Sequence, residues 1–485
     1  MKRTVNVLSK LNWGKRACAV LALCATTAIA LPAQTLTTLF SFDGTDGAVP
    51  QAGLVQATNG DLYGTTVSGG TNTNGTVFKI TPGGALTTLY SFCSLGYPCA
   101  DGDSPYAGLV QASNGDLYGT TYSGGANRYG TVFKITPGGT PTTLYSFCSQ
   151  SGCTDGLAPY AALVQAANGD LYGTTVYGGA DGFGTVFKIT PSGALTTLYR
   201  FCSDYPSCTD GADPYAGLVQ AANGDFYGTT YGGGANGNYG TVFKITPGGT
   251  LTTLYSFCSQ SGCTDGDHPE AGLVQAADGD FYGTTSGSGF SIATVFKITP
   301  TGTLTTLHSF NGTTDGATPA AGLVQATNGD FYGTASSGAN GYGTVFKITP
   351  SGTLTTLYRF CHQTHCPDGA TPHAGLVQDT NGDFYGTTIE GGSNNDGTVF
   401  RLSVGLGPFV KPRPPYGKVE AAVKILGTNL TGATSVSFDG TAAVFTVVSS
   451  SEITTTVPAG ASSGKVQVVT PSGTLSSNAS FLVVP

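Results

Sequence analysis

Four short apolar patterns recur in fixed order along residues 35–404. They are "AGLVQA", "NGD(L/F)YGTT", "GTVFKIT" and "LTTLYSF", and the set returns every 50 to 55 residues. Asn-Gly between two apolar runs predicts a type I′ hairpin turn, because both central residues of that turn need positive φ. "TPGG", "TPSG" or "TPTG" predicts a second hairpin between the third and fourth runs. Each repeat is therefore predicted to form four antiparallel strands.

The number of repeats predicts a closed ring. "NGD"-type turns occur seven times, at 59, 114, 168, 223, 278, 328 and 381, and "TVF" also occurs seven times. The first "TTL" run, Leu36 to Phe42, precedes every repeat, whereas the last repeat ends at "GTVFRL" without a fourth strand. We expect the N-terminal strand to pair beside Gly397 to Leu402 and close a seven-bladed β-propeller without exposed edges. A linear β-solenoid is the alternative, and it would not need the displaced strand.

The repeat units "NGDLYGTT…GG…GTVFKITPGG" resemble the bacterial tandem repeat known as the GloVer (Gloeo-Verruco) repeat, over nearly all of residues 35–404. That resemblance implies an exported or surface-associated protein and brings no activity with it. We assign residues 34–404 to the propeller.

The pattern changes after "GLGPFVKPRPPYGK", residues 405–418, whose prolines indicate a linker. Residues 419–485 alternate apolar and polar positions in short strands, as in a small β-sandwich. Their segments "ILGTNLTGATSVSFDGTAA" and "TTTVPAGASSGKVQVVT" resemble an IPT/TIG immunoglobulin-like domain, which implies a spacer or contact module. The predicted fold is thus all-β, a propeller followed by an immunoglobulin-like domain.

The first 33 residues have the composition of a secretory signal peptide. Five basic residues precede the apolar run Ala17 to Leu31, and small residues follow near Ala30 and Ala33. The run is shorter than the roughly 20 residues of a membrane-spanning helix, so we expect a secreted or cell-surface protein without membrane insertion.

Charge and cysteine content agree with export. Without residues 1–33 the chain has 15 basic and 28 acidic residues, a net charge of −13, which argues against nucleic acid as a partner. Five close cysteine pairs each follow an "LYSF" or "LYRF" run and predict local disulfides. The pairs are Cys93/Cys99, Cys148/Cys153, Cys202/Cys208, Cys258/Cys263 and Cys361/Cys366. "CHQTHC" invites a metal site with His362 and His365, but we interpret it as a fifth disulfide and expect no metal.

Residues that differ between repeats are the candidates for binding. The strand order places the cysteine loops and the "GG" loops on one face of the disc, where propellers often bind ligands. The position after each loop proline opens the innermost strand and is predicted to ring the mouth of the central channel. It holds Gln51, Tyr106, Tyr160, Tyr215, Glu270, Ala320 and His373. These side chains suit an extracellular sugar or peptide, and packing between blades is the alternative.

Residues that recur in every repeat are interpreted as scaffold. The loop aspartates are expected to bond their own backbone in turns, and one Lys or Arg per blade is expected to pair with aspartate. A second aromatic set, Tyr129, Phe183, Tyr239 and Tyr342, is expected mainly to wedge between blades.

One cluster of acid and base residues, Asp267, His268 and Glu270 in "DGDHPEAG", belongs to no repeat pattern. It leaves open a polysaccharide-degrading hydrolase or lyase centred on Glu270. A structural surface-layer or adhesion protein is a further alternative. We favour a monomeric, non-catalytic binding or scaffolding module that needs no cofactor and recognises extracellular carbohydrate or protein.

Overall fold

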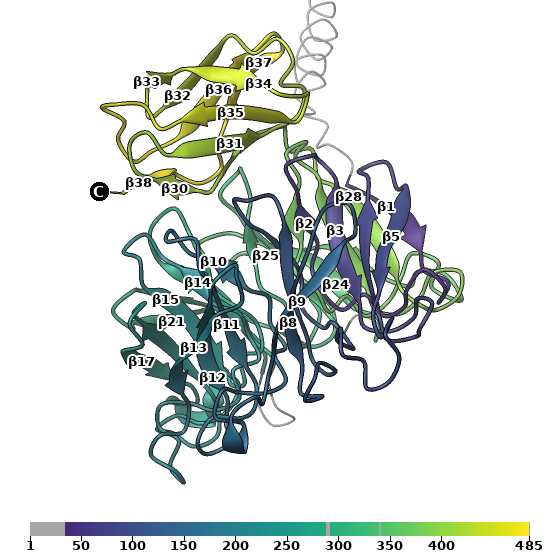
Figure 1. Ribbon diagram of the computed structural model, residues 1–485, viewed down its shortest axis with the longest axis vertical. Coiled ribbons are helices and arrows are strands. Elements are labelled where there is room, and N and C mark those ends of the chain that lie inside the picture. Colours follow the sequence, from purple (N-terminus) through teal and green to yellow (C-terminus); the bar gives the residue numbers. More distant parts are fainter. Residues whose placement is uncertain (1–33, 288–291, 339–340, 485) are drawn as a thin grey trace, which may run out of the picture.

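The computed structural model describes residues 34–287, 292–338 and 341–484, and the predicted signal peptide lies outside them. The described chain is built from strands, with two single-turn 3₁₀ helices, η2 (Ser151–Cys153) and η3 (Ser261–Cys263). Seven four-stranded antiparallel sheets form the blades of a β-propeller, and a β-sandwich follows (Figure 1).

Each of the first six blades uses four consecutive strands. The strands are β2 (Val55–Gln56), β3 (Leu62–Thr66), β4 (Thr76–Ile80) and β5 (Leu86–Ser91) in blade 1; β6 (Val110–Gln111), β7 (Leu117–Thr121), β8 (Thr131–Ile135) and β9 (Pro141–Ser146) in blade 2; β10 (Val164–Gln165), β11 (Leu171–Thr175), β12 (Thr185–Ile189) and β13 (Leu195–Arg200) in blade 3; β14 (Val219–Gln220), β15 (Phe226–Thr230), β16 (Thr241–Ile245) and β17 (Leu251–Ser256) in blade 4; β18 (Val274–Gln275), β19 (Phe281–Thr285), β20 (Thr294–Ile298) and β21 (Leu304–Ser309) in blade 5; and β22 (Val324–Gln325), β23 (Phe331–Ala335), β24 (Thr344–Ile348) and β25 (Leu354–Arg359) in blade 6.

Blade 7 is completed by the start of the chain, as the sequence predicts. It contains β26 (Val377–Gln378), β27 (Phe384–Thr388), β28 (Thr398–Ser403) and the N-terminal β1 (Thr35–Ser41). β1 runs antiparallel to β28, with Thr35 opposite Ser403 and Ser41 opposite Thr398. The ring is therefore closed by backbone pairing between the two ends of the repeat region.

The blades are joined by the same side-chain bond at every interface. A threonine in the second strand of each blade donates its hydroxyl hydrogen to a backbone carbonyl in the inner segment of the next blade, as in Thr65 to Ala107 at 2.8 Å. The bond between Thr387 and Ala52, at 3.2 Å, joins blade 7 to blade 1. The other five are Thr120 to Ala161, Thr174 to Ala216, Thr229 to Ala271, Thr284 to Ala321 and Thr334 to Ala374.

The innermost strands are shorter than predicted. Only two residues of each "AGLVQA" segment pair as a strand, because the Ala carbonyl before them accepts from the neighbouring blade. The adjoining glycines also lie close to that neighbour: a Cβ on Gly53 would come within 3.1 Å of the carbonyl oxygen of Gly375. Close approach of the blades around the axis thus replaces part of the strand ladder.

The Asn-Gly turn also differs from its prediction. In the first repeat only Gly60 has positive φ, +87°, and its amide donates to the Ala57 carbonyl. This is a longer hairpin loop that ends in a left-handed glycine, not a two-residue type I′ turn. The Asn59 side chain explains the difference, because it accepts from the Asp61 amide and donates to the Tyr63 hydroxyl. Those bonds hold Asn59 outside the left-handed region.

The hydrophobic core lies between blades. The phenylalanine directly after each outermost strand packs edge to face on a phenylalanine of the next blade, with ring centroids 5.1–5.4 Å apart. Phe42, directly after β1, supplies the pair with Phe78 that joins blade 7 to blade 1, and it is fully buried. Each blade therefore buries its faces only in contact with its neighbours.

The C-terminal domain is a β-sandwich of two four-stranded sheets, with a small parallel pair beside them. Its strands are β29 (Lys411–Arg413), β30 (Tyr416–Gly417), β31 (Ala422–Leu426), β32 (Ser435–Phe438), β33 (Thr441–Ala443), β34 (Phe445–Val447), β35 (Glu452–Thr456), β36 (Val466–Thr470), β37 (Gly473–Ser476) and β38 (Leu482–Val483). Its core includes Val423, Ile425, Phe438 and Phe481.

The predicted linker, residues 405–418, contains two of these strands. β29 pairs with β31, and β30 pairs with β38. The prolines do not prevent this, because β29 is an edge strand and its Pro412 needs no amide hydrogen on the open side. The domain therefore begins several residues earlier than its sequence pattern indicates.

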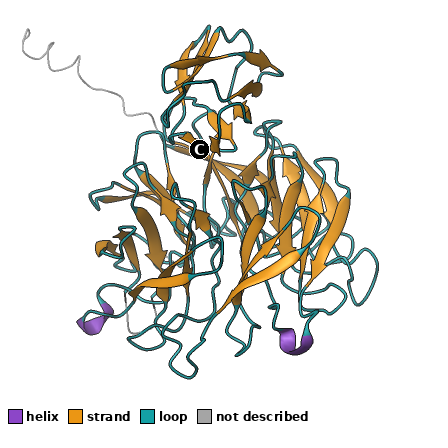
Figure 2. Cartoon of the chain, turned by 60° about the vertical axis from the view of Figure 1, so that its left-hand side comes forward, coloured by secondary structure: helices purple, strands orange, loops and turns teal. Residues whose placement is uncertain are grey.

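This domain sits on the face of the disc that carries the hairpins between the first and second strands. The Tyr416 hydroxyl donates to the Gln165 carbonyl at 3.0 Å, and the Asn478 side chain donates to the Gln325 carbonyl at 3.4 Å. The Lys411 ammonium group donates to the Gln378 carbonyl. Figure 2 shows the sandwich at the top and the two 3₁₀ turns of the cysteine loops at the opposite end. The cysteine-loop face is thus left uncovered by this domain.

Replacement of Phe42 by alanine tests whether β1 locks the ring. Loss of this buried ring should lower the free energy of unfolding by about 3–5 kcal/mol. Thr37→Ala, at an exposed position of the same strand, should change it by less than about 0.5 kcal/mol. Urea denaturation followed by far-ultraviolet circular dichroism measures both. Equal stability of the two variants would contradict the packing described.

Candidate functional site

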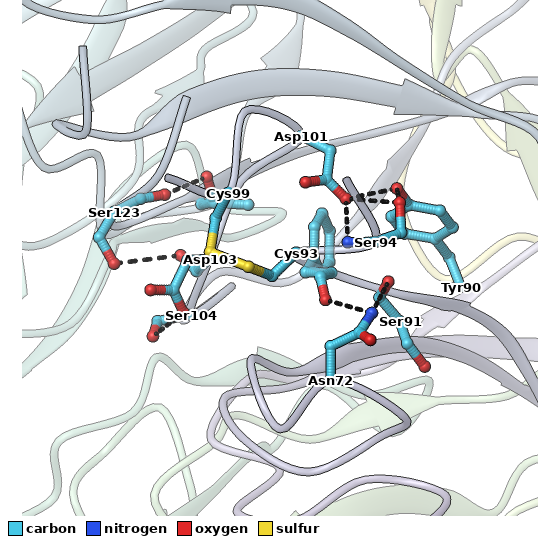
Figure 3. The surroundings of a disulfide bond; sticks show 12 residues. Asn72, Tyr90, Ser91, Cys93, Ser94, Cys99, Asp101, Asp103, Ser104 and Ser123 are labelled. Carbon is cyan, nitrogen blue, oxygen red and sulfur yellow. Dashed lines mark hydrogen bonds between the residues drawn. A yellow bond between two sulfur atoms is a disulfide. The ribbon is translucent and has the colours of Figure 1, made fainter. Parts of the chain in front are cut away.

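The cysteine loops are clamped where the sequence predicts disulfides. All five pairs are bonded: Cys93–Cys99, Cys148–Cys153, Cys202–Cys208, Cys258–Cys263 and Cys361–Cys366. "CHQTHC" is accordingly a disulfide loop, and His362 lies 3.8 Å from the Asp368 carboxylate. Figure 3 shows the first loop, where the Asn72 side chain reaches over to the Ser91 carbonyl. The loop therefore carries bonds to the neighbouring "GG" loop as well as its own disulfide.

The recurrent loop aspartates bond the loop backbone as predicted, and those of the cysteine loops also bond a tyrosine. Asp101 accepts from the Tyr90 hydroxyl at 2.5 Å and from the Ser94 amide at 2.9 Å (Figure 3). Burial, followed by the bond to Asp101, raises the pKa of Tyr90 to about 12. The same tyrosine–aspartate bond occurs in the other four cysteine loops, through Asp155, Asp210, Asp265 and Asp368. These aspartates tie the loop to the outer strand and not only to local backbone.

The predicted ion pairs of the scaffold are confirmed. The lysine of each "FKI" strand faces the aspartate of the "NGD" turn in the same blade, as in Lys79 with Asp61 at 3.7 Å. The remaining pairs are Lys134–Asp116, Lys188–Asp170, Lys244–Asp225, Lys297–Asp280, Lys347–Asp330 and Arg401–Asp383. All lie on the hairpin face, away from the cysteine loops.

The predicted channel-mouth residues line one cavity of about 410 Å³. All seven blades contribute to it, and the position after the loop proline provides Gln51, Tyr106, Tyr160, Tyr215, Glu270, Ala320 and His373. The small residues that follow, Gly53 and its counterparts, form the deeper wall. We refer to this space as the channel-mouth cavity.

One half of the channel-mouth cavity is aromatic. The rings of Tyr106 and Tyr160 stack with centroids 5.0 Å apart and planes 22° apart, and Tyr215 meets Tyr160 edge to face at 5.4 Å. The Gln51 amide donates to the Tyr160 hydroxyl at 2.7 Å, which links blade 1 to blade 3 across the mouth. Burial, and then Tyr106 and Glu270, raise the pKa of Tyr160. These rings form a connected wall and are not separate surface residues.

The other half is polar. Burial raises the pKa of Glu270 and lowers the pKa of His373, so both groups favour their neutral forms relative to water. Glu270 also adds to the electrostatic field that raises the pKa of Tyr231. The cavity thus offers a carboxyl, an imidazole and an amide opposite a set of phenol rings.

Two tyrosines at the channel-mouth cavity were missed by sequence reasoning: Tyr231 lines the cavity, and Tyr122 packs against a lining residue. Tyr122 meets Tyr106 edge to face at 5.4 Å, and Tyr231 meets Tyr215 at 5.5 Å. Both directly follow the "GTT" of a second strand, where the other blades carry Val, Ser or Ile. This departure from the repeat is the signal that would have found them.

The second aromatic set divides between two environments. Phe183 and Tyr239 pack against core clusters that span neighbouring blades. Tyr129 and Tyr342 are instead 46% and 41% exposed. The predicted packing between blades is therefore confirmed for Phe183 and Tyr239.

The acid–base cluster near Glu270 is only partly assembled in the cavity. Asp267 is fully buried and lies 3.3 Å from Nδ1 of His268, whose ring faces Tyr231. Glu270 lines the cavity, whereas Asp267 and His268 lie behind its wall. Across residues 34–287, 292–338 and 341–484, no group of three or more His, Cys, Asp or Glu is placed to hold a metal ion. The same residues include no helix with the length and hydropathy to cross a membrane.

The sequence profile of the Gloeobacter/Verrucomicrobia repeat matches residues 26–207, 97–274 and 259–411. The IPT/TIG domain profile matches residues 413–483, which agrees with the early start of the C-terminal domain. No curated protein is similar enough in sequence to count as a relative.

Solved structures resemble the chain remotely. A fungal alcohol oxidase of the AA5 family in complex with copper is 12% identical, with a TM-score of 0.49 over 93% of this chain and 99% of that one. A Bacteroides thetaiotaomicron protein of unknown function is 15% identical, with a TM-score of 0.40 over 68% of this chain and 82% of that one. An auxiliary nutrient binding protein from the same organism is 13% identical, with a TM-score of 0.38 over 61% and 68%. Likenesses this remote indicate nothing about the activity of this chain.

The buried carboxyl of Asp213 predicts a pH dependence of stability. Burial raises the pKa of Asp213 to about 6. The folded state therefore holds this proton more tightly than the unfolded chain, and stability is lost as the pH rises from about 4 to 6. At about pH 7.5 the free energy of unfolding of Asp213→Asn should be about 1–2 kcal/mol higher than that of the parent, a value reduced for the partial exposure of the carboxyl. At about pH 4 the two proteins should be equally stable.

Thermal unfolding across this pH range measures the difference. Asparagine tolerates the positive φ of Asp213, +55°, as well as aspartate does. Asp181→Asn, at an exposed loop position, is the control and should leave the pH profile unchanged. A profile of Asp213→Asn that parallels the parent would refute the assignment.

Proposed function

The chain belongs to the Gloeobacter/Verrucomicrobia repeat family, and from that premise we propose that it is a non-catalytic extracellular module that binds carbohydrate in the channel-mouth cavity. The repeats, the IPT/TIG domain and the five disulfides together fit an extracellular binding or scaffolding module. The observation that carries the finer part, the binding of carbohydrate, is the aromatic wall of Tyr106, Tyr160 and Tyr215 opposite polar side chains.

The chemistry of this wall suits a sugar. A pyranose has an apolar C–H face that packs on aromatic rings and a rim of hydroxyls that need hydrogen-bond partners. Tyrosine is available for the first role, and Gln51, Glu270 and His373 can serve the second. No lysine or arginine lines the cavity, so a neutral glycan is favoured over a strongly acidic one.

The surrounding architecture supports a rigid binding site. The disulfides and the tyrosine–aspartate bonds fix the loops that lie beside the mouth. The C-terminal domain occupies the opposite face and leaves this one accessible. A site fixed before binding loses less entropy when its ligand binds.

Glycan binding is tested by alanine substitution of the wall tyrosines. A glycan array with the chain from residue 34 onward should identify a ligand, and isothermal titration calorimetry should then show that Tyr106→Ala or Tyr215→Ala weakens it about tenfold or more. Tyr129→Ala is the matched control, because Tyr129 is exposed and outside the cavity lining. Unchanged affinity in both wall variants would remove the cavity from consideration, and self-association without glycan binding would favour a structural surface protein.

A second function, hydrolysis or elimination on a polysaccharide, is favoured by one observation. Glu270 lies in the cavity wall with a pKa raised by burial, which is a property of general acids. On our proposal, Glu270→Gln leaves the glycan intact in both proteins and changes affinity only. Release of reducing ends by the parent and its loss in Glu270→Gln, measured by a reducing-sugar assay, would establish the enzyme instead.

A further inference from the structure

A second cavity lies between the two domains, on the face opposite the channel mouth. Its volume is about 470 Å³. One wall consists of the inner strands of blades 2, 3 and 4 with hairpin residues of blades 1 and 2, and the other consists of residues 413–416 with parts of β31 and β35. We refer to it as the interdomain cavity, and the function proposed above makes no use of it.

The interdomain cavity has an apolar wall of repeated residues. Val110, Val164 and Val219, the first residues of β6, β10 and β14, face Pro414 and Pro415 of the C-terminal domain. Each valine is half-buried although it belongs to an inner strand. These side chains present an apolar surface that neither domain covers.

The charge of the interdomain cavity is opposite to that of the protein. Its lining includes Arg413 and Lys424 and no aspartate or glutamate. Lys424 is paired with Glu452 at 3.3 Å, whereas the Arg413 side chain makes no hydrogen bond or ion pair with any residue that the structure describes. The full chain carries a net charge of −8, so an uncompensated cation at a domain interface is unexpected.

The polar groups around Arg413 are already engaged. In the propeller wall, the Gln111 side chain accepts from the Thr58 amide at 2.8 Å and donates to the Gly115 carbonyl at 3.1 Å. Lys411, two residues before Arg413, donates to the Gln378 carbonyl. Arg413 thus lines a largely apolar space, and the donors of its side chain are unused among the described residues.

An isolated guanidinium in such a space gains most from an anion. It remains protonated at neutral pH, and its planar donors match a carboxylate in two parallel hydrogen bonds. The apolar surface beside it would bury a hydrocarbon body. We propose that the interdomain cavity binds a small organic carboxylate, whose carboxylate pairs with Arg413 and whose apolar body packs on Val110, Val164 and Val219.

Titration calorimetry with defined probes tests this proposal on the chain from residue 34 onward. Octanoate and phenylacetate are the probes, acetate lacks the apolar body, and octanamide lacks the charge. At least one probe should bind with one site per chain at concentrations up to about 1 mM, and its matched acetate or octanamide control should bind about tenfold more weakly or worse.

Two variants locate the binding. Arg413→Gln removes the charge and should weaken the probe about tenfold to a hundredfold. Ser113→Phe keeps the charge but fills the cavity from an exposed hairpin position, and it should weaken the probe as well. Arg359→Gln, at an exposed position on the outer strand of blade 6, is the matched control and should bind as the parent does.

The outcomes separate this site from the glycan site. Substitution of Tyr106 or Tyr215 should leave carboxylate binding unchanged, because these residues line the other cavity. Failure of both probes to bind the parent, or binding that is equal in parent, Arg413→Gln and Ser113→Phe, would overturn the proposal. Should Arg413→Gln fail to fold, the comparison of probe with uncharged control and the Ser113→Phe variant decide the question.

Discussion

Contact between neighbouring blades is the interaction on which this structure depends. A single blade has four short strands, the innermost only two residues long, and cannot cover its own apolar faces. Its phenylalanines and its second-strand threonine find partners in the next blade, and the sequence repeats those partners seven times. The ring has to close for the first and last blades to receive the same contacts, and β1 supplies them by pairing with β28.

In a closed ring of similar units, residues that recur in every blade can be told apart from residues that occur in one or a few blades. Residues present in every blade hold the blades and the ring together: the Lys79–Asp61 type of ion pair lies within a blade, and the Thr65–Ala107 type of bond joins neighbouring blades. Positions that differ between blades converge at the channel mouth, where seven units meet. This end of the axis gathers tyrosines, Glu270 and His373 around a cavity, and the other receives the C-terminal domain with its unpaired Arg413. The two cavities for which we propose ligands thus lie where side chains differ between blades or where the C-terminal domain meets the ring.

The sequence was informative where one residue type has one local consequence in every repeat. It predicted the blade number, the closure, the disulfides and the ring of residues after the loop prolines. It missed side-chain hydrogen bonds that replace a predicted turn or add to one. The Asn59 side chain forms hydrogen bonds with Tyr63 and Asp61, which replace the predicted type I′ turn by a longer loop. The aspartates of the cysteine loops accept a hydrogen bond from a tyrosine of the outer strand. The interdomain cavity was not predictable, because no local pattern states which face of the disc the last domain covers.

Hydrogen exchange of the β1 amides tests the closed ring most directly. The strand ladder of Thr35–Ser41 is formed with β28 of blade 7, so its protection reports on closure of the ring. We predict that β1 amides exchange as slowly as those of the outer strands β5 and β13, which hold the same place in other blades. Exchange of β1 at the rate of an unfolded segment, with the other blades protected, would contradict the account.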